Sequence, residues 1–473
     1  MQENYSVISG SNDIQLIDLF SGCGGFGFGF LNSGFNLISG LDFNESAAKT
    51  ASINLFWQNG LTEQHFCSDI QNFDLDLIGV KIDKTKPLVV IGGPPCQAYS
   101  QIGRAKLRSL GEHRIHTKDK RGMLYNDFIN AVLEFDADIA VMENVMESVN
   151  YGGQNIPNTV AEIFEENGYS AKWTVLNSAD FGVPQIRERV FVIASKDKEV
   201  LRDVLPSPTH YPINGMVSSG MKRIKKFKES SHFIEPKDYE LAKREWISVS
   251  EAISDLPSLH PSGKSEYKYL NVNMKMKYDS EPQNEYQKLM RLYNGEIMSA
   301  VSANSYRRTK RDYPIFELMK PGDNYKAASE IADYLLDQYC RFNNIEQSES
   351  NTHYIDAKKK IVPPYSREKF LSKWRKLSPN IPSHTLVAHL SVDTYSHIHP
   401  WEARGISIRE AARIQSFPDY FIFQTTMGDA YKQIGNAVPP LLSEAISNSI
   451  KEYFFNSPYG EGESSCYEFI STN

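Results

Sequence analysis

The segment GGPPC at residues 92–96 could place a cysteine thiol for nucleophilic chemistry. The apolar run before it, residues 88–91, predicts a short buried strand that the glycines and prolines end abruptly. Cys96 would then lie at the carboxyl end of a strand, where open parallel sheets bind their ligands. A thiolate there is a candidate nucleophile, but a lone cysteine is often a buried structural residue. The segment supplies no base to activate the thiol, so on its own it leaves both interpretations open.

Charged side chains occupy comparable positions later in the chain. Glu143 follows the predicted strand 139–142. It could donate a proton if burial raises its pKa, or it could act as a helix cap or in a salt bridge. Arg187 and Arg189 alternate along the predicted strand 186–194 and therefore share one face of it. Two arginines that project together are typical of anion or carbonyl recognition, or of an ion-pair ladder with acidic neighbours.

The start of the chain contains a candidate cofactor site. A predicted strand at 14–20 runs into the glycine-rich turn 21–25, whose backbone could approach a cofactor or pack closely against another element. The turn lacks the GxxxxGK pattern, which disfavours a nucleoside triphosphate. After the second predicted strand, 36–41, Asp42 could accept hydrogen bonds from ribose hydroxyls and Phe43 could stack on an adenine. Alternatively Asp42 caps the predicted helix 45–55, a role for which Asn44 competes.

The composition is that of a soluble globular protein, with 41% hydrophobic and 23% charged residues among 473. This length suffices for two or three domains. No apolar run is long enough to span a membrane, and the first residues do not resemble a secretory signal. None of the five cysteines forms a CxxC pair, so neither a zinc site nor a disulfide framework is indicated. We therefore expect a cytoplasmic protein with reduced thiols and no metal site.

The net charge of −7 is unevenly distributed. Residues 196–400 contain 32 Lys and Arg but 26 Asp and Glu, a net charge of +6, so the remainder carries −13. Basic clusters at 222–226, 307–311, 358–360 and 373–376 could bind phosphates, although each alone is more typical of solvated surface. The stretch 100–121 is also basic and too long for a passive connection, which predicts a mobile lid over a polyanion.

Taken together and in this order, six motifs resemble the cytosine-C5 DNA methyltransferase family. They are DLFSGCGG (18–25), GPPCQ (93–97), ENV (143–145), QIRER (185–189), REAAR (409–413) and GNAVPP (435–440). The resemblance implies a Rossmann-like α/β sheet of an S-adenosylmethionine-dependent methyltransferase. The catalytic domain would comprise 1–198 and 400–473, with the second part folded back beside the first. An irregular target-recognition domain, 199–399, would be inserted between them.

The resemblance also implies which residues bind S-adenosylmethionine. Phe20, Gly22 and Gly24 would bind its amino-acid end. Asp42 would bind the ribose hydroxyls, while Phe43 would flank the adenine. The adenine edge and the rest of the pocket would be formed by Asp69, Ile70, Leu124 and Asn436.

In the implied mechanism, Cys96 attacks C6 of a cytosine that has been flipped out of the duplex. Glu143 protonates or hydrogen-bonds N3 and thereby stabilises the charge that forms, and C5 then takes the methyl group. Arg187 would hold the cytosine carbonyl oxygen, and Arg189 would support either the Glu143 carboxylate or the covalent adduct.

Three alternatives remain at the level of the sequence. The first is an RNA (tRNA) cytosine-C5 methyltransferase of the same fold. The long basic insert favours double-stranded DNA over RNA, because reading a DNA sequence requires an additional recognition surface. The second is a regulatory DNA-binding protein with a relict core, and the third is a dinucleotide oxidoreductase, which leaves the Pro-Pro-Cys turn unexplained. We expect a monomer, and a restriction–modification role for a standalone enzyme of this kind.

Overall fold

The computed structural model describes residues 14–95, 124–197, 204–217, 219–259, 272–307, 312–367, 373–390 and 395–456. Cys96 and the predicted lid 100–121 lie outside the described residues.

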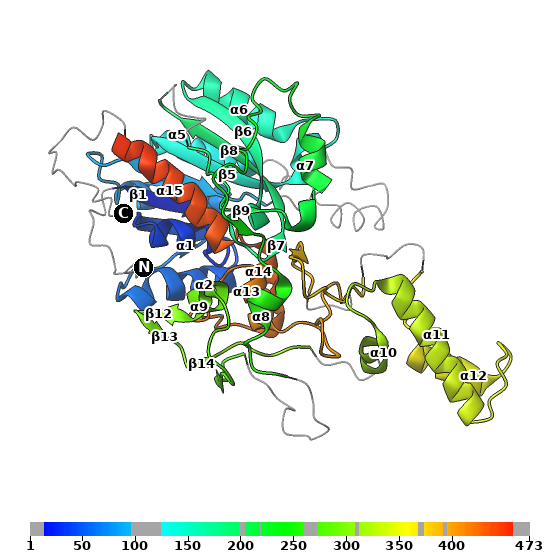
Figure 1. Cartoon of the computed structure of the whole chain (residues 1–473). Helices are drawn as coiled ribbons and strands as arrows, with labels where there is room; N and C mark the ends of the chain where they lie inside the picture. Colours follow the sequence, from blue (N-terminus) through cyan, green and yellow to red (C-terminus); the bar gives the residue numbers. More distant parts are fainter. Residues whose placement is uncertain are drawn as a thin grey trace.

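The body of the molecule is built on a seven-stranded sheet with the order β3-β2-β1-β4-β5-β8-β6 (Figure 1). Its strands are β1 (Gln15–Leu19), β2 (Asn36–Asp42), β3 (Phe66–Cys67), β4 (Leu88–Gly92), β5 (Ile139–Val145), β6 (Ser170–Asn177) and β8 (Glu188–Ser195). The first five strands in this order, β3, β2, β1, β4 and β5, are parallel to one another. Strand β8 runs antiparallel to both of its neighbours, β5 and β6. The predicted α/β fold with a Rossmann-like sheet is confirmed. The wholly buried β1 and β4 explain the continuous apolar runs, because helices cover both faces of the sheet.

Alternate side chains of the central strands enter two separate cores. Leu16 and Val89 pack with residues of α1 (Gly25–Asn32) and α15 (Pro440–Asn456), while Ile17 and Val90 pack with residues of α5 (Leu124–Glu134) and α6 (Ile156–Glu166). The long α15 lies along α1 (Figure 1). The expectation that the end of the chain folds back beside its beginning is therefore confirmed.

The remaining helices of the body are α2 (Glu45–Leu55), α3 (Asp76–Gly79), α7 (Ser219–Ile224), α8 (Val249–Ile253), α9 (Glu285–Arg291), α13 (Ile408–Ile414) and α14 (Met427–Asn436). Short 3-10 helices occur at η1 (Trp57–Asn59), η2 (Ile70–Asn72), η5 (Met146–Asn150), η6 (Ser178–Phe181) and η7 (Ile213–Gly215). Among the helices of the described ranges, none combines the length and the apolar character needed to cross a membrane.

Small two-stranded sheets lie outside the central sheet. They are β9 (His210–Tyr211) with β10 (Arg244–Glu245), β11 (Met276–Lys277) with β14 (Ala300–Val301), β12 (Leu292–Tyr293) with β13 (Glu296–Ile297), and β7 (Gln185–Ile186) with β15 (Ser383–His384). The last pair is parallel and joins the QIRER motif to the end of the inserted region. It thus brings two segments that are about 200 residues apart to one place.

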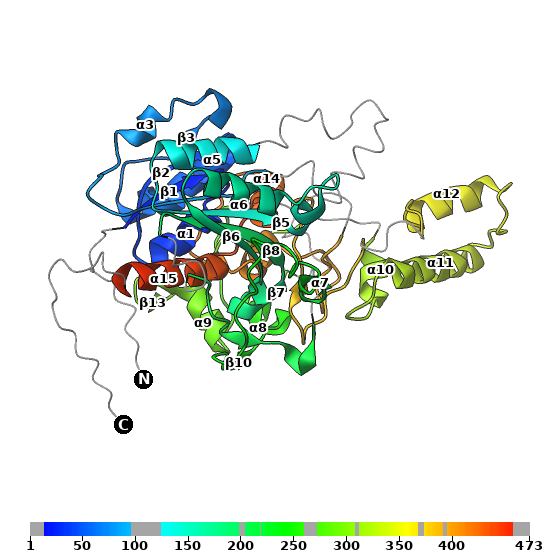
Figure 2. The same ribbon diagram turned by 90° about the horizontal axis from the view of Figure 1, so that it is seen from above.

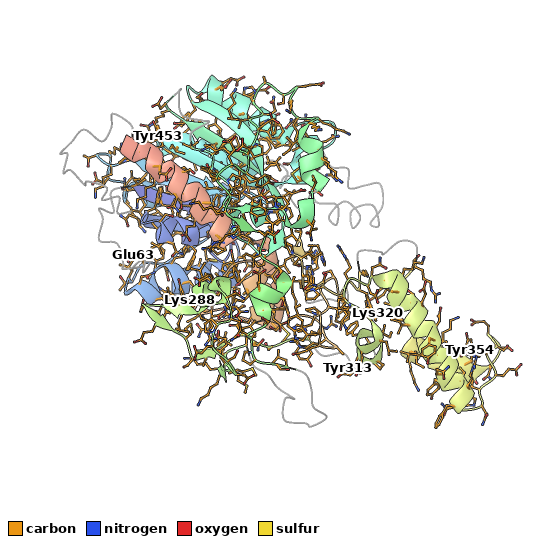
Figure 3. The ribbon with its side chains drawn as sticks, in the orientation of Figure 1. Glu63, Lys288, Tyr313, Lys320, Tyr354 and Tyr453 are labelled. Atoms are coloured by element: carbon orange, nitrogen blue, oxygen red, sulfur yellow. The ribbon has the colours of Figure 1, made fainter. Side chains whose placement is uncertain are left out.

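The inserted region has two parts with different packing. Val249, Ala252 and Met290 belong to the same core as α13 and α15, so α8 and α9 are continuous with the body. In contrast, α10 (Tyr313–Leu318) and α11 (Tyr325–Phe342) pack around Trp374, while α12 (Thr352–Ile361) packs against α11 in a separate cluster. The three helices extend away from the body (Figures 1 and 2). Figure 3 shows Tyr354 on this projection and Lys288, on α9, on the far side of the body. The domain boundaries at 199 and 399 remain a prediction.

The irregular character expected for this region does not extend to α11, a regular helix of 18 residues. Its buried apolar positions, Tyr325, Ala328, Ala332, Leu336 and Cys340, recur every three or four residues. That spacing gives the helix one apolar face, which packs against α10, α12 and Trp374. The periodic signal was present in the sequence, but the surrounding charged residues obscured it.

Candidate active site

The turn that leads to Cys96 lies beside Glu143. Strands β4 and β5 are neighbours in parallel register, with Gly92 opposite Met142, so their carboxyl ends meet at one edge of the sheet. A Cβ atom built on Gly93 would lie 3.2 Å from Glu143 Oε2, which is tight contact. The structure therefore brings Glu143 to the segment from which Cys96 follows, although Cys96 itself lies outside the described residues.

Glu143 is paired with one of the two predicted arginines. Arg189 Nε lies 3.0 Å from Glu143 Oε1, and the side chains are only 14% and 12% exposed. Burial raises the pKa of Glu143, while Arg189 and then Arg187 oppose that shift. Burial thus favours the protonated acid, whereas the arginines favour the carboxylate.

Three of the five N–H groups of Arg187, which was predicted to contact a cytosine carbonyl, bind backbone carbonyls instead. The residue is 1% exposed. Its Nη1 donates to the carbonyl of Leu386 at 3.1 Å, and its Nη2 donates to those of Gly435 at 3.0 Å and Ala437 at 3.1 Å. Only its Nε has no acceptor among the described residues. The two arginines of the motif thus have different partners, which their equal spacing on a strand did not reveal.

Gln185, at the start of the same motif, has a structural role that the sequence analysis did not assign. It is buried, and its Oε1 accepts a hydrogen bond from the backbone N–H of Leu386 at 2.7 Å. Its amide group donates to the Ile414 carbonyl and to the Gln415 side chain. The motif therefore also fastens β15 and α13 to the body.

Asp42 fixes the backbone of the glycine-rich turn by a hydrogen bond. Phe20, Gly22 and Gly24 all have positive φ angles, of 56°, 56° and 88°. Asp42 Oδ2 accepts a hydrogen bond from Gly22 N at 2.8 Å, and its Oδ1 accepts one from Asn44 N at 2.7 Å. Asn44, not Asp42, caps α2, through a bond of 2.9 Å from Ala47 N. The carboxylate of Asp42 is therefore not used as the helix cap, and burial raises its pKa.

The two glycines face different surroundings. A Cβ atom on Gly22 would have no atom within 4 Å, whereas one on Gly24 would lie 2.7 Å from Leu55 Cδ1. Gly24 is thus required by its close packing against α2. Gly22 presents backbone to open space, as a cofactor contact requires.

Other features of this edge fit an adenosyl cofactor. The Phe43 ring is 76% exposed next to Asp42, an unusual position for a large apolar side chain. Each Asp42 oxygen accepts only one of these bonds and keeps capacity for a hydroxyl group. The buried Ser21 Oγ has no partner among the described residues. An aromatic face, a carboxylate and a free polar atom around Gly22 match the adenine, ribose and polar tail of such a molecule.

The remaining predicted cofactor residues occupy several elements. Ile70 is buried, and Asp69 begins η2 with its carboxylate accepting from Gln71 N at 3.2 Å. Leu124 is half-buried at the start of α5. Asn436 is exposed at the end of α14, and the turn after it contacts the glycine-rich turn, since a Cβ on Gly25 would lie 2.6 Å from Val438 O.

An exposed thiol that the sequence analysis did not single out lies at the same edge. Cys67 pairs with Asp42 in the register of β2 and β3, and its Sγ lies 3.9 Å from the Phe43 carbonyl oxygen. Partial desolvation, followed by the charges of Glu45 and Asp42, raises the pKa of its thiol above the ordinary value. Its position on a strand of two residues gave no strong sequence signal.

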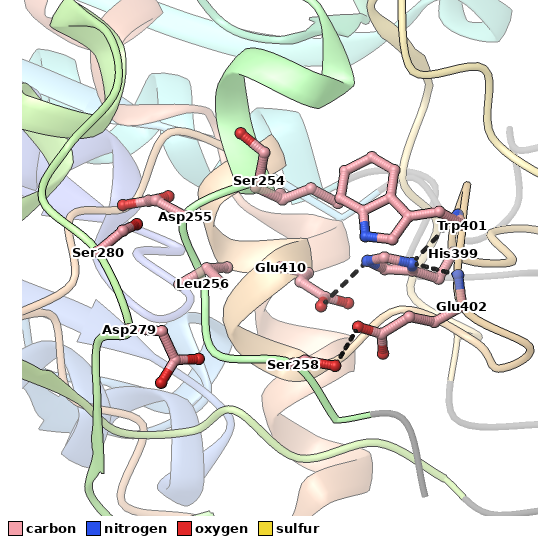
Figure 4. Close-up of a pocket in the computed structure, with 11 residues that line it drawn as sticks. Ser254, Asp255, Leu256, Ser258, Asp279, Ser280, His399, Trp401, Glu402 and Glu410 are labelled. Carbon is pink, nitrogen blue, oxygen red and sulfur yellow. Dashed lines mark hydrogen bonds and ion pairs between the residues drawn. The ribbon is translucent and has the colours of Figure 1, made fainter. Parts of the chain in front are cut away.

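A cavity of about 410 Å³ lies elsewhere, between α8 and the segment 399–402 (Figure 4). Three of the carboxylates that line it are paired with arginines: Arg404 binds Glu402 at 2.6 Å and Glu410 at 2.7 Å, and Arg413 binds Asp255 at 3.0 Å. His399 is fixed between the backbone N–H of Glu402, at 3.0 Å, and Glu410. No cluster of potential metal ligands occurs among the described residues. This cavity is accordingly a junction within the fold, apart from the predicted site.

Comparisons with known proteins give a consistent result. A family model for C-5 cytosine-specific DNA methylases matches residues 14–452. M.OihORF3336P of Oceanobacillus iheyensis is 49% identical over 96% of this chain and 98% of its own length. The type II methyltransferase M.AgeI of Thalassovita gelatinovora is 30% identical over 93% of this chain and 99% of its own. A crystal structure of a prophage-encoded E. coli protein has a TM-score of 0.58 at 20% identity, covering 93% of this chain and 99% of that one.

Proposed function

The chain belongs to the family of C-5 cytosine-specific DNA methylases, and on that premise we propose that it methylates C5 of a cytosine within double-stranded DNA. The observation that carries the proposal is the position of Glu143. Its carboxyl group is buried, bound to Arg189, and in contact range of the turn that leads to Cys96. An acid and a nucleophile at adjacent strand ends are what the reaction requires.

We propose that Cys96 and Glu143 act on opposite sides of the cytosine ring. The Cys96 thiolate forms an S–C6 bond, and the electron pair of the C5–C6 double bond moves so that C5 becomes nucleophilic. Protonation of N3 by Glu143 neutralises the charge that would otherwise collect on the ring. After C5 has been methylated, loss of the C5 proton restores the double bond and expels the thiolate. A base stacked in a duplex cannot expose C6, so the cytosine must be flipped out.

S-adenosylmethionine, when bound, supplies an electrophilic methyl group on a sulfonium. The open turn and the exposed ring support the following assignments for its binding: Phe20, Gly22 and Gly24 for the polar tail, Asp42 for the ribose, and Phe43, Asp69, Ile70, Leu124 and Asn436 for the adenine and the pocket around it. Gly24 contributes through its backbone, because its Cβ side is filled by Leu55.

The two arginines have separate roles in this proposal. Arg189 holds Glu143, with which it forms the ion pair, and so stabilises the carboxylate left after proton transfer. Arg187 is assigned to positioning and not to the cytosine carbonyl, because its terminal nitrogens already bind three backbone carbonyls. This changes the role first expected for Arg187.

Double-stranded DNA is the proposed substrate. Support comes from the family and from relatives named as type II methyltransferases, which also favour a restriction–modification role. The alternative substrate is tRNA, since the same chemistry applies to any accessible cytosine.

The proposal is tested by methyl transfer from labelled S-adenosylmethionine to plasmid DNA and, separately, to tRNA. We expect incorporation into DNA only, at one sequence context that bisulfite sequencing would reveal. The variant Cys96→Ser should bind DNA without methylating it. Activity on tRNA alone would refute the DNA assignment, and full activity of the serine variant would refute the nucleophile.

A further inference from the structure

Arg187 donates hydrogen bonds to the backbone on both sides of Asn436. Its Nη2 donates to the carbonyl of Gly435 at 3.0 Å and to that of Ala437 at 3.1 Å. Asn436 lies between these residues with an exposed side chain, while Arg187 is 1% exposed. One buried guanidinium therefore binds the peptide group just before Asn436 and the peptide group just after Ala437, and so restrains the short turn that carries the Asn436 side chain.

The same turn is fixed by two further contacts. Gln415 donates to the Ala437 carbonyl at 2.6 Å, so that oxygen accepts two hydrogen bonds. On the other side, a Cβ on Gly435 would lie 2.5 Å from the Val387 carbonyl carbon, so the backbone of Val387 lies directly against the turn. The turn has little freedom as long as these neighbours stay in place.

Arg187 also binds the segment returning from the inserted region. Its Nη1 donates to the Leu386 carbonyl at 3.1 Å, and the N–H of that residue is bound by Gln185. The Thr385 hydroxyl adds a bond of 2.8 Å to the Ile186 carbonyl. A single side chain thus links the turn of Asn436 to residues 383–386.

We infer that Arg187 is a positioning residue for the cofactor: it holds Asn436 at the cofactor site and ties that site to the end of the inserted region. The inference rests on the proposed function, which assigns Asn436 to S-adenosylmethionine. It separates Arg187 from Arg189, which acts on Glu143. Loss of Arg187 should therefore affect cofactor affinity more than the rate of the chemical steps.

The test compares the affinity for S-adenosylhomocysteine, measured by calorimetry, with kcat at saturating S-adenosylmethionine. Arg187→Gln should raise Kd and the KM for S-adenosylmethionine about 10-fold and change kcat less than about threefold. Arg187→Lys, which keeps a buried cation but lacks the planar fork that reaches all three carbonyls, should restore the affinity only in part. Gln415→Ala, which loosens the turn and leaves Arg187 in place, should raise Kd to a smaller extent.

Arg409 provides a matched control. It too is fully buried, and it donates to three backbone carbonyls, those of Ser302, Pro418 and Phe421, at 2.9–3.0 Å. None of them belongs to the Asn436 turn. Arg409→Gln should lower the unfolding temperature about as much as Arg187→Gln but leave Kd unchanged. If both variants weaken binding alike, the effect is general loosening and the inference is wrong.

A double-mutant cycle with Asn436→Ala makes the test specific. Because Arg187 acts through Asn436, the double variant should bind S-adenosylhomocysteine no more weakly than the worse single variant. Additive losses would contradict the inference, as would a reduced kcat with unchanged Kd, which would return Arg187 to the cytosine. Absence of binding by the unaltered protein would refute the proposed function as well, whereas unchanged binding by Arg187→Gln and by Gln415→Ala would refute this inference alone.

Discussion

At the scale of single residues, the pair of Glu143 and Arg189 sets the chemistry that the site can perform. Burial raises the pKa of Glu143, and Arg189, at 3.0 Å, is the larger of the two charges that oppose the shift. Burial thus favours the protonated acid and Arg189 favours the carboxylate, which are the two forms that a proton donor passes between.

Replacing Arg189 with Gln should alter the pH dependence of methylation. Without the guanidinium, the pKa of Glu143 rises further, because its burial is unchanged. The protonated acid then persists to higher pH, so the descending limb of the pH–rate profile should move upward. The maximal rate should fall about 100-fold, since the carboxylate formed by proton transfer is no longer stabilised. Single-turnover rates measured as a function of pH check this.

Glu143→Gln serves as the control, because its amide cannot titrate. This variant should react much more slowly, and its pH–rate profile should lack the descending limb. A limb that stays in place in the Arg189 variant would mean that another group controls it.

The sequence identified Glu143 and Arg189 because each lies on or next to a strand whose apolar pattern is clear. It could not identify the role of Arg187. The partners of that residue are 199, 248 and 250 residues away, and only the folded chain brings them together. Local spacing gives the face of a strand, but it does not show whether solvent, substrate or backbone covers that face.

At the scale of elements, the contact between α1 and α15 unites the two ends of the chain. It depends on small residues, since a Cβ on Gly29 would lie 2.5 Å from both Glu444 N and Ser443 Cβ. The strands and most helices of the body were predictable from their apolar periodicity. The antiparallel direction of β8 was not, because a short buried strand reads the same in either direction.

Gly29→Ala should destabilise the protein by about 2 kcal/mol, because backbone of α15 cannot give way to the added methyl group. This cost exceeds the gain in helix propensity, which is about 1 kcal/mol. Thermal unfolding measures the result. Gly79→Ala is the control: the site is helical and has no atom within 4 Å of a new Cβ, so stability should stay the same or rise. Equal stability of the Gly29 variant and the unaltered protein would show that the helices can separate.

At the scale of the whole molecule, the structure locates part of the positive charge of the inserted region on one surface. Lys222, Arg223, Lys225 and Lys226, which we call the basic platform, are exposed, and none takes part in an ion pair within the described part of the chain. Ile224 anchors the platform in the core beside β6. In both ribbon views α7 lies on the side of the body from which α11 and α12 extend (Figures 1 and 2). A duplex held between the body and this projection would have its phosphates near the platform.

We expect the basic platform to bind DNA phosphates outside the target sequence. Lys225→Gln with Lys226→Gln, in the inactive Cys96→Ser background, should weaken duplex binding and lower the slope of log K against log salt by about 2, because each phosphate that is no longer neutralised removes about 0.9. Preference for the target sequence should persist, because phosphate contacts carry no base information. Binding titrations over a range of salt concentrations measure both quantities.

The matched control replaces two exposed lysines elsewhere with Gln, Lys84 in the turn between α3 and β4, and Lys288 on the far side of the body (Figure 3). This control removes the same number of positive charges, so a difference between the two double variants depends on where the charges lie and not on how many are removed. If binding to phosphates determines the effect, the slope for this control should match that of the unaltered protein, since only released counterions enter the slope. Equal slopes for both double variants would instead show that the platform is solvated surface, the more usual role of a basic cluster.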